Sequence, residues 1–297
     1  MRSKIMFDFA PADREPGSGP GAEKEEEGTE KIAIMRMTPQ RIDALSEDQR
    51  AAIMQRSMGD VGAVTDHVRK IVENVRIGGD TAVLEDCRRL KVDVSSADLE
   101  VTREEVDAAY KEVDSSVVRS LKEAATNIEK FHRAQLERQM WSIEVTEGVL
   151  AGRMTRPIES AGCYVPGGTA AYPSSVLMTV IPAKVAGVKQ IVAVTPPGSG
   201  MKGNPYTLVA SHIAGCDRIF KVGGPWGVAG LAFGTETMPR VVKIVGPGNK
   251  YVTAAKMLVY GQVDIDSPAG PSEALILADE TGNPRWIAMD FFSQIEH

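Results

Sequence analysis

The sequence is poor in cysteine and has neither a long apolar run nor an excess of basic residues. Its three cysteines, Cys87, Cys163 and Cys216, lie far apart in a chain of 297 residues, which excludes a disulfide scaffold and favours a reducing, cytoplasmic location. No run of about 18 apolar residues occurs, and the N-terminus has no apolar segment of the signal-peptide type, so neither a membrane span nor a signal peptide is predicted. Lysine and arginine number 34 against 40 acidic residues, and the net charge of −6 excludes a basic nucleic-acid-binding surface.

The composition is otherwise that of a folded protein, with one exception at the N-terminus. Apolar residues make up 43% of the chain and charged residues 25%, as in globular proteins, and the length indicates two domains or one domain with an insertion. Residues 1–32 instead combine prolines and glycines with an acidic run at 23–27. Such a segment buries too little apolar surface to fold, so we predict a disordered acidic tail, with a docking arm for a basic partner as the alternative.

Residues 33–160 show helical periodicity and are interpreted as the helical N-terminal part of a first α/β domain. Apolar residues recur at helical spacing from Val64 to Val75 and predict one buried helix face that ends at Gly78-Gly79. A longer helix is expected over 116–139 and a hairpin over 141–158. Helix starts are predicted by a cap and proline at Thr38-Pro39 and by the capping boxes Ser46/Gln49 and Thr102/Glu105.

From residue 160 onward, short apolar runs alternate with capped helical stretches. Repeated strand–helix units form a parallel, doubly wound sheet that binds ligands at the carboxyl ends of its strands. We therefore predict a second, Rossmann-like α/β domain over 161–272 and a return of residues 273–297 to the first domain. The predicted strands are 162–165, 190–194, 218–222, 241–245 and 274–278, and the predicted helices are 174–187, 204–215, 225–234 and 249–261.

The glycine-rich loops between these elements do not match the common nucleotide-binding fingerprints. Gly168 occupies the position of the phosphate-binding lysine of a P-loop, which rejects that motif. The loop at Gly246-Pro247-Gly248 begins as G-x-G but has Tyr251 where the third glycine is needed for close helix–strand packing. Any dinucleotide must therefore bind in another way, and on the alternative interpretation the glycines only form tight turns.

One pair of residues near the C-terminus has metal-ligand spacing. A helix is predicted from Asn283-Pro284, and Gln294 and His297 are three residues apart on it, so both side chains lie on one face. Imidazole is a common zinc ligand and an amide oxygen is an unusual one. The spacing is compatible with a shared metal ion, but it equally fits a polar, exposed helix end.

Four motifs, in this order along the chain, resemble those of the histidinol dehydrogenase family. The resemblance runs from about residue 35 to residue 297 and leaves out only the N-terminal segment. The motifs are GCYVPGG at 162–168, TETMP at 235–239 with VGPGNKYV at 245–252, DSPAGPSE at 266–273, and SQIEH at 293–297.

The resemblance implies an activity and a set of binding residues. The family oxidises L-histidinol through the aldehyde to L-histidine, the last steps of histidine biosynthesis, with NAD and zinc. It is a homodimer with an incomplete Rossmann-like fold similar to that of aldehyde dehydrogenases. By position, the zinc and substrate ligands fall on Gln294 and His297, the substrate-contacting serine falls on Ser272, and the NAD contacts fall on Tyr164 and Asn249.

Two departures from the family pattern leave alternatives open. Pro225-Trp226 stands where the family commonly has a glutamine that contacts the cofactor. The family's Glu-His acid/base pair and its other zinc ligands, an Asp and a His, fall beyond residue 297, so no catalytic base is assigned here. The chain is therefore interpreted as a fragment that does not catalyse alone. The alternatives are a related enzyme acting on another small alcohol, or a non-catalytic binding paralogue.

Overall fold

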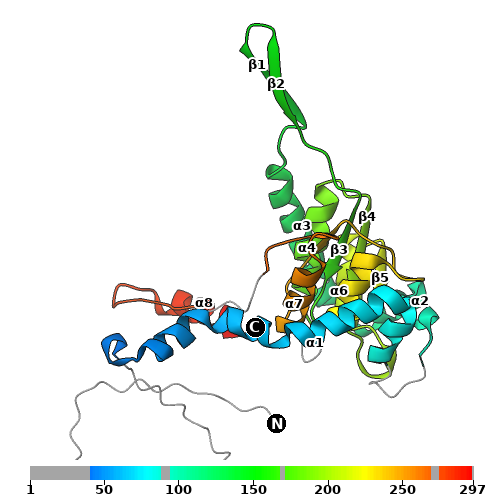
Figure 1. Cartoon of the computed structure of the whole chain (residues 1–297), viewed down its shortest axis with the longest axis horizontal. Coiled ribbons are helices and arrows are strands. Elements are labelled where there is room, and N and C mark those ends of the chain that lie inside the picture. Colours follow the sequence, from blue (N-terminus) through cyan, green and yellow to red (C-terminus); the bar gives the residue numbers. More distant parts are fainter. Residues whose placement is uncertain (1–40, 88–93, 168–170, 269–273, 296–297) are drawn as a thin grey trace, which may run out of the picture. The chain divides into compact units, whose positions relative to one another are not determined.

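The computed structural model describes residues 41–87, 94–167, 171–268 and 274–295, and Figure 1 labels the elements of the chain. The predicted acidic tail at 1–32 and the predicted helix start at Thr38-Pro39 lie outside the described residues. The chain divides after Gln55 into two units, which are described separately.

In the first unit, a short 3-10 helix, η1 (Ile42–Ala44), precedes the start of α1 (Glu47–Cys87). The N–H of Ser46 donates to Gln49 Oε1 at 2.9 Å, and the N–H of Gln49 donates to Ser46 Oγ at 3.2 Å. This reciprocal pair satisfies two of the amide groups that a helix start leaves without an intrahelical partner. The predicted capping box is thereby confirmed.

In the second unit, α1 is kinked at Gly79, which has a φ of 52° and a ψ of −133°. Val64, Val68 and Val75 are buried before the kink, which confirms the predicted helix face and its interruption. Side chains of the segment 235–237 form hydrogen bonds with Asp80, the residue that follows the kink. The N–H of Asp80 donates to Glu236 Oε2 at 2.7 Å, and the Asp80 carboxylate accepts hydrogen bonds from the hydroxyls of Thr235 and Thr237.

Two further helices, α2 (Arg103–Glu112) and α3 (Ser115–Ala134), follow the 3-10 helix η3 (Ser96–Asp98). The capping box of Thr102 and Glu105 is present at the start of α2. The prediction that α3 extends to residue 139 is wrong, because the carbonyl of Gln139 accepts the Thr155 N–H at 2.8 Å. Gln139 therefore belongs to the hairpin ladder instead of the helix.

The predicted hairpin is present as strands β1 (Met140–Thr146) and β2 (Val149–Met154). The two strands pair antiparallel from Met140/Met154 to Thr146/Val149, with an irregularity between Glu144 and Thr146. Gly148 provides the positive φ, 76°, that the turn requires. All residues of both strands are exposed.

A second sheet has five strands in the order β5-β4-β3-β6-β7. All of its neighbouring strands run parallel, and this confirms the predicted parallel α/β architecture. The order reverses between β3 and β6, since the chain first adds strands on one side of β3 and then on the other. The strands are β3 (Ser160–Tyr164), β4 (Gln190–Val194), β5 (Arg218–Phe220), β6 (Lys243–Val245) and β7 (Asp264–Ile265).

The predicted strand at 274–278 is wrong. The described residues there form no ladder, and Leu275 and Leu277 are 92% and 94% exposed, so no neighbouring surface supports a strand. The edge position next to β6 belongs to β7, which has only two residues. At the opposite edge, the N–H of Val101 donates to Ile219 O at 2.8 Å, so the segment that precedes α2 pairs antiparallel with β5.

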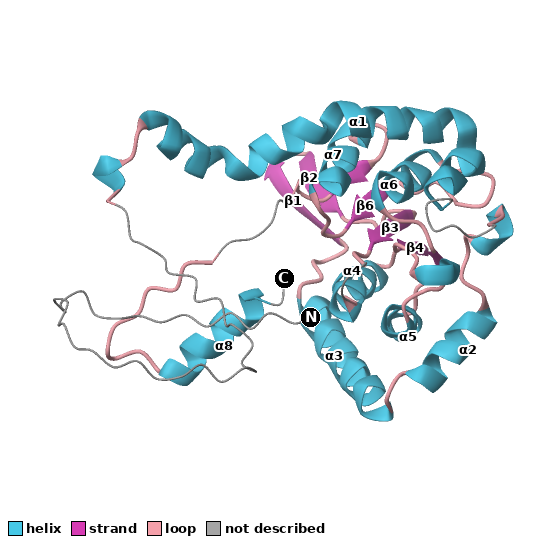
Figure 2. Ribbon diagram, turned by 90° about the horizontal axis from the view of Figure 1, so that it is seen from below, coloured by secondary structure: helices cyan, strands magenta, loops and turns pink. Residues whose placement is uncertain are grey.

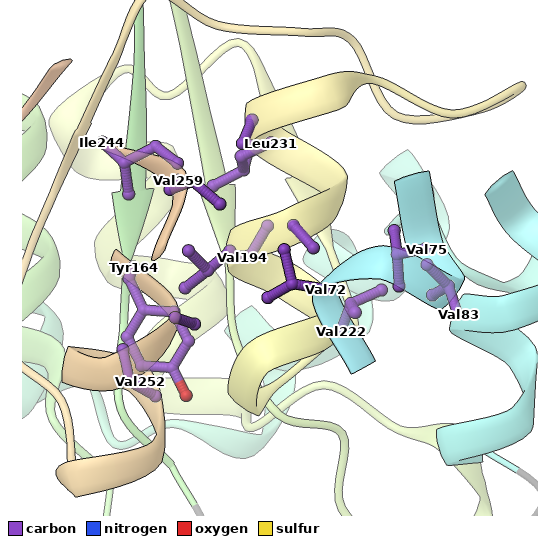
Figure 3. Packing of buried hydrophobic residues seen from close by; sticks show 14 of the residues in the cluster. Val72, Val75, Val83, Tyr164, Val194, Val222, Leu231, Ile244, Val252 and Val259 are labelled. Carbon is purple, nitrogen blue, oxygen red and sulfur yellow. The ribbon is translucent and has the colours of Figure 1, made fainter. Parts of the chain in front are cut away.

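Helices pack on both faces of this sheet, as Figure 2 shows. The remaining helices are α4 (Pro173–Val185), η4 (Ser199–Met201), α5 (Pro205–Ala214), α6 (Gly224–Phe233), α7 (Lys250–Val259) and α8 (Pro284–Ile295). Val192 and Val194 of β4 point to one face, where α1, α6 and α7 pack. Ile191 and Ala193 point to the other face, where α3, α4 and α5 pack. Figure 3 shows the first of these cores.

Among the helices that the structure describes, none is long and apolar enough to span a bilayer.

Close packing of α6 depends on a glycine, because a Cβ on Gly227 would lie 2.9 Å from the carbonyl oxygen of Val222 and 3.3 Å from Val194 Cγ2. Gly62, on α1, has no atom within 4 Å of the corresponding position.

We expect Gly227→Ala to lower the free energy of unfolding by about 1–3 kcal/mol, because the added methyl group forces α6 away from β4. Gly62→Ala is the matched control, since alanine there raises the stability by about 0.5–1 kcal/mol. Urea unfolding followed by circular dichroism measures both changes. A Gly227→Ala protein as stable as Gly62→Ala would contradict this account of the helix packing.

Candidate functional site

The loops that follow β3 and β6 lie side by side where the strand order of the sheet reverses. Cys163 of β3 pairs with Val245 of β6, so the loop at 165–167 and the loop at 246–249 leave the sheet next to each other. In open α/β sheets, ligands bind outside the carboxyl ends of the strands at such a point. This edge of the sheet is therefore the candidate site.

Gly246, the first residue after β6, lies against the backbone at the end of β3 and cannot be replaced by a larger residue. Its φ is 121°, and a Cβ at this position would collide with the carbonyl oxygen of Tyr164. Close backbone approach of this kind is a property of glycine alone. The G-x-G sequence at 246–248 thus reflects packing between β3 and β6, whatever ligand the loop binds.

The peptide groups of Gly246 are held by an ion pair between the buried Lys256 and the partly exposed Asp266. Gly246 donates its N–H to Asp266 Oδ2 at 2.7 Å, and its carbonyl oxygen accepts a hydrogen bond from Lys256 Nζ at 3.0 Å. The same Lys256 Nζ forms an ion pair with Asp266. Lys256 belongs to α7 and is 3% exposed, so α7, the loop and the segment after β7 meet at one buried charge.

Sequence reasoning missed Lys256 and Asp266 as parts of the site. Lys256 is a helical lysine among Val252, Ala255 and Val259, all of which are buried. A lysine within an apolar helix face is the signal that could have identified it, because a lysine is almost never fully buried without a partner.

Tyr164, a predicted cofactor residue, lies in the core at the end of β3. It is 3% exposed, and its hydroxyl accepts a hydrogen bond from the N–H of Gly224 at 3.0 Å. Burial raises the pKa of Tyr164 to about 12, and the Gly224 hydrogen bond lowers that pKa slightly. The phenol therefore stays neutral at physiological pH and fixes the first residue of α6 against β3.

Asn249, the other predicted cofactor residue, caps α7. Its Oδ1 accepts hydrogen bonds from the N–H groups of Tyr251 at 3.0 Å and Val252 at 3.2 Å. The equivalent cap on α5 is Asn204, whose Oδ1 accepts from Tyr206 and Thr207 at 3.0 and 3.3 Å. The two helices thus begin in the same way, but only α7 follows the G-x-G loop. Because Asn249 occupies the N–H groups of Tyr251 and Val252, the start of α7 favours an anionic group through the positive end of the helix dipole.

The loop after β5 is packed tightly against the loop after β4. A Cβ on Gly223 would lie 2.6 Å from Pro196 Cγ. Trp226 lies in the first turn of α6 and is partly buried against the core. The aromatic ring therefore has a packing role in addition to any effect on a ligand.

A hollow of about 900 Å³ adjoins this edge of the sheet. Its lining includes Gly246, Pro247, Asp266 and Ser267, and α4 contributes apolar residues such as Met178. The volume lies in the usual range for small-molecule pockets.

The predicted zinc and substrate residues are only partly described. Gln294 lies in the last turn of α8, whereas Ser272 and His297 lie outside the described residues. Within residues 41–87, 94–167, 171–268 and 274–295, no group of three His, Cys, Asp or Glu side chains could hold a metal ion. The structure therefore brings together Tyr164, Asn249 and the G-x-G loop, and of the two predicted metal residues it describes only Gln294.

Comparison with known proteins identifies similar sequences and a similar structure. The family model described as histidinol dehydrogenase matches residues 54–297. The chain is 49% identical over 263 residues to histidinol dehydrogenase of Methanococcus maripaludis, covering 88% of this chain and 61% of that protein. It is 51% identical over 245 residues to histidinol dehydrogenase of Methanothermobacter thermautotrophicus, covering 82% of this chain and 57% of that protein.

The structural comparison agrees with the sequence matches. The crystal structure of histidinol dehydrogenase from Elizabethkingia anophelis matches with a TM-score of 0.74 and 41% sequence identity, covering 79% of this chain and 54% of that chain. The chain spans 57–61% of the length of the two curated relatives named above.

We expect Tyr164→Phe to change stability in a pH-dependent way. Because the folded pKa of about 12 exceeds the unfolded value of about 10, the contribution of Tyr164 is fully present below pH ~10 and is lost as the pH rises toward 12. At pH 7 the variant should be less stable by about 1 kcal/mol, the value of one hydrogen bond. Toward pH 12 the wild type should lose up to about 3 kcal/mol relative to the variant.

Urea unfolding of both proteins at several pH values measures this difference. The comparison with the variant is necessary because burial also raises the pKa of Cys163 to about 12, and this thiol is common to both proteins. A stability difference that stays constant from pH 7 to pH 12 would show that Tyr164 is not buried as described.

Proposed function

Because the chain belongs to the histidinol dehydrogenase family, we propose that it forms the cofactor- and substrate-binding part of an enzyme that oxidises L-histidinol through the aldehyde to L-histidine. The proposed cofactors are NAD and zinc. Within residues 1–297 we assign binding roles only, because the family pattern places its Glu-His acid/base pair after the Gln/His pair.

The observation that supports NAD binding best is the start of α7 at the reversal point of the sheet. Gly246 brings the loop close to β3, and Asn249 caps α7, which begins at Lys250, shortly after the carboxyl end of β6. A pyrophosphate at such a place is stabilised by the positive end of the helix dipole. NAD supplies the hydride acceptor, and the protein's own contribution is to hold the dinucleotide in one orientation.

Tyr164 and Asn249 are proposed to act on the cofactor from these positions. Asn249 uses its Oδ1 as a helix cap, which leaves the carboxamide N–H₂ group as the donor toward a ligand. Tyr164 uses its hydroxyl to hold Gly224 and thereby sets the start of α6 beside the same edge. Accurate placement of a bound reactant is worth several kcal/mol of an activation barrier.

Ser272, Gln294 and His297 are proposed to bind the substrate, the latter two also as zinc ligands. Zinc supplies a Lewis acid that orients amine and imidazole nitrogens. The described residues contain one of the two proposed ligands, Gln294, in the last turn of α8. A catalytic zinc needs three protein ligands, so we derive no step through the metal from these residues.

Several broader features remain part of the same proposal. The parallel sheet with helices on both faces supports a Rossmann-like fold similar to that of aldehyde dehydrogenases, with domain boundaries at 33–160, 161–272 and 273–297. We propose a cytoplasmic homodimer. The exposed apolar residues of the β1–β2 hairpin, among them Trp141 and Leu150, are compatible with a protein partner.

Two matched cap variants test NAD binding. Asn249→Ala and Asn204→Ala each remove one helix cap and should each lower the free energy of unfolding by about 1 kcal/mol. Only Asn249→Ala should weaken NAD⁺ binding, by about tenfold, which corresponds to about 1.4 kcal/mol. Isothermal titration calorimetry of the folded chain with NAD⁺ measures the affinity. Equal affinities of the two variants for NAD⁺ would contradict the proposed location.

A second candidate function is oxidation of another small amino alcohol, which the half-buried Trp226 favours. The protein made from its complete gene should reduce NAD⁺ in the presence of zinc with a higher kcat/KM for L-histidinol than for other small amino alcohols. The reverse order of kcat/KM would reject L-histidinol as the substrate and support the second candidate.

A further inference from the structure

We propose that Lys256 and Asp266 are positioning residues that hold the cofactor loop at 246–249 and the start of α7 in one fixed arrangement. This inference rests on the function proposed above and extends it to two residues for which the family motifs give no role. Neither side chain needs to touch the cofactor for the pair to act.

The first support is geometric. The two side chains of the ion pair bind the backbone N–H and the backbone carbonyl of Gly246. The N–H donates to Asp266 Oδ2 at 2.7 Å, and the carbonyl oxygen accepts from Lys256 Nζ at 3.0 Å. Gly246 has a φ of 121°, which is not a strand conformation, and its N–H and carbonyl groups form these hydrogen bonds with side chains. The pair therefore determines where the loop begins and, through Lys256, how α7 is placed relative to it.

The second support is electrostatic. The side chain of Lys256 is 4% exposed and that of Asp266 is 34% exposed. A buried ammonium group is costly unless an anion compensates it, so loss of one partner leaves a charge that the fold does not accommodate. The pairing of the two charges consequently favours one geometry of the loop and the helix, as a positioning role requires.

The third support is connectivity. Lys256 comes from α7, which begins at the proposed cofactor residue Asn249. Asp266 follows β7 and precedes Ser272 by six residues in the sequence. Gly246 and Asp266 both line the hollow of about 900 Å³. One ion pair thus joins α7, the loop at 246–249 and the segment that follows β7.

A second buried lysine provides a matched control. Lys221 follows β5 and is 4% exposed, and its Nζ pairs with Glu105 Oε1 at 2.7 Å. Its Nζ binds a side-chain carboxylate of α2 and makes no described hydrogen bond to the loop at 246–249. Removal of Lys221 should therefore cost stability without changing the cofactor loop.

The experiment measures NAD⁺ affinity by calorimetry and stability by urea unfolding for four proteins: the wild type, Asp266→Asn, Lys221→Met and the double variant Lys256→Met/Asp266→Asn. We expect Asp266→Asn to lose stability and to bind NAD⁺ at least about tenfold more weakly. Lys221→Met should lose stability and keep its affinity within about twofold. The double variant, which buries no unpaired charge, should recover stability but not affinity.

The outcomes separate this inference from the proposed function. Wild-type affinity in Asp266→Asn and in the double variant, with both proteins folded, would overturn the positioning role and leave NAD binding intact. Affinity that recovers together with stability in the double variant would also overturn it, because the pair would then be only structural. No binding of NAD⁺ by the wild-type chain would overturn both.

Discussion

Strand β3 is the constraint on which the rest of the structure depends. All five of its residues are buried, it pairs with β4 on one side and β6 on the other, and helices cover both of its faces. The loop after β3 leads to α4 on one face of the sheet, and the loop after β6 leads to α7 on the other face. The two loops therefore start side by side at the carboxyl ends of the strands and then diverge. The candidate site is a consequence of this topology before any side chain is considered.

The contacts at this edge explain why the motifs have their residue types. Gly246 is a glycine because β3 approaches it closely, and Asn249 is an asparagine that caps α7. The TETMP motif has a different role, since Glu236 and the two threonines hold α1 at the kink after Gly79. Motifs that mark one family thus include residues that shape the fold as well as residues near the ligand site.

Much of this arrangement could be predicted from the sequence, because it is encoded locally. Four of the five predicted strands in the parallel region and all four helices between them are present, since Asn-Pro, Pro and Gly signals mark their ends. The strand predicted at 274–278 failed because an apolar run needs a surface to pack on, and Leu275 and Leu277 have none among the described residues. The edge strand β7 was missed because two residues show no periodicity.

The site was predicted less completely than the fold, for a physical reason. The role of Lys256 depends on Asp266, ten residues later in the chain, and on the carbonyl of Gly246, ten residues earlier. No pattern of helical spacing identifies such a partner, because it is created by the packing of α7 against the sheet. Similarly, the burial of Tyr164 and its bond to Gly224 follow from the position of α6.

The central claim is that a dinucleotide binds where the strand order reverses. The most direct measurement is the change in backbone amide resonances of the isotope-labelled chain as NAD⁺ is added. The account predicts that the largest shifts occur at 246–252 and 223–227, at the starts of α7 and α6. Shifts confined to residues at the opposite edge of the sheet, such as the ends of α4 and α5, would contradict it.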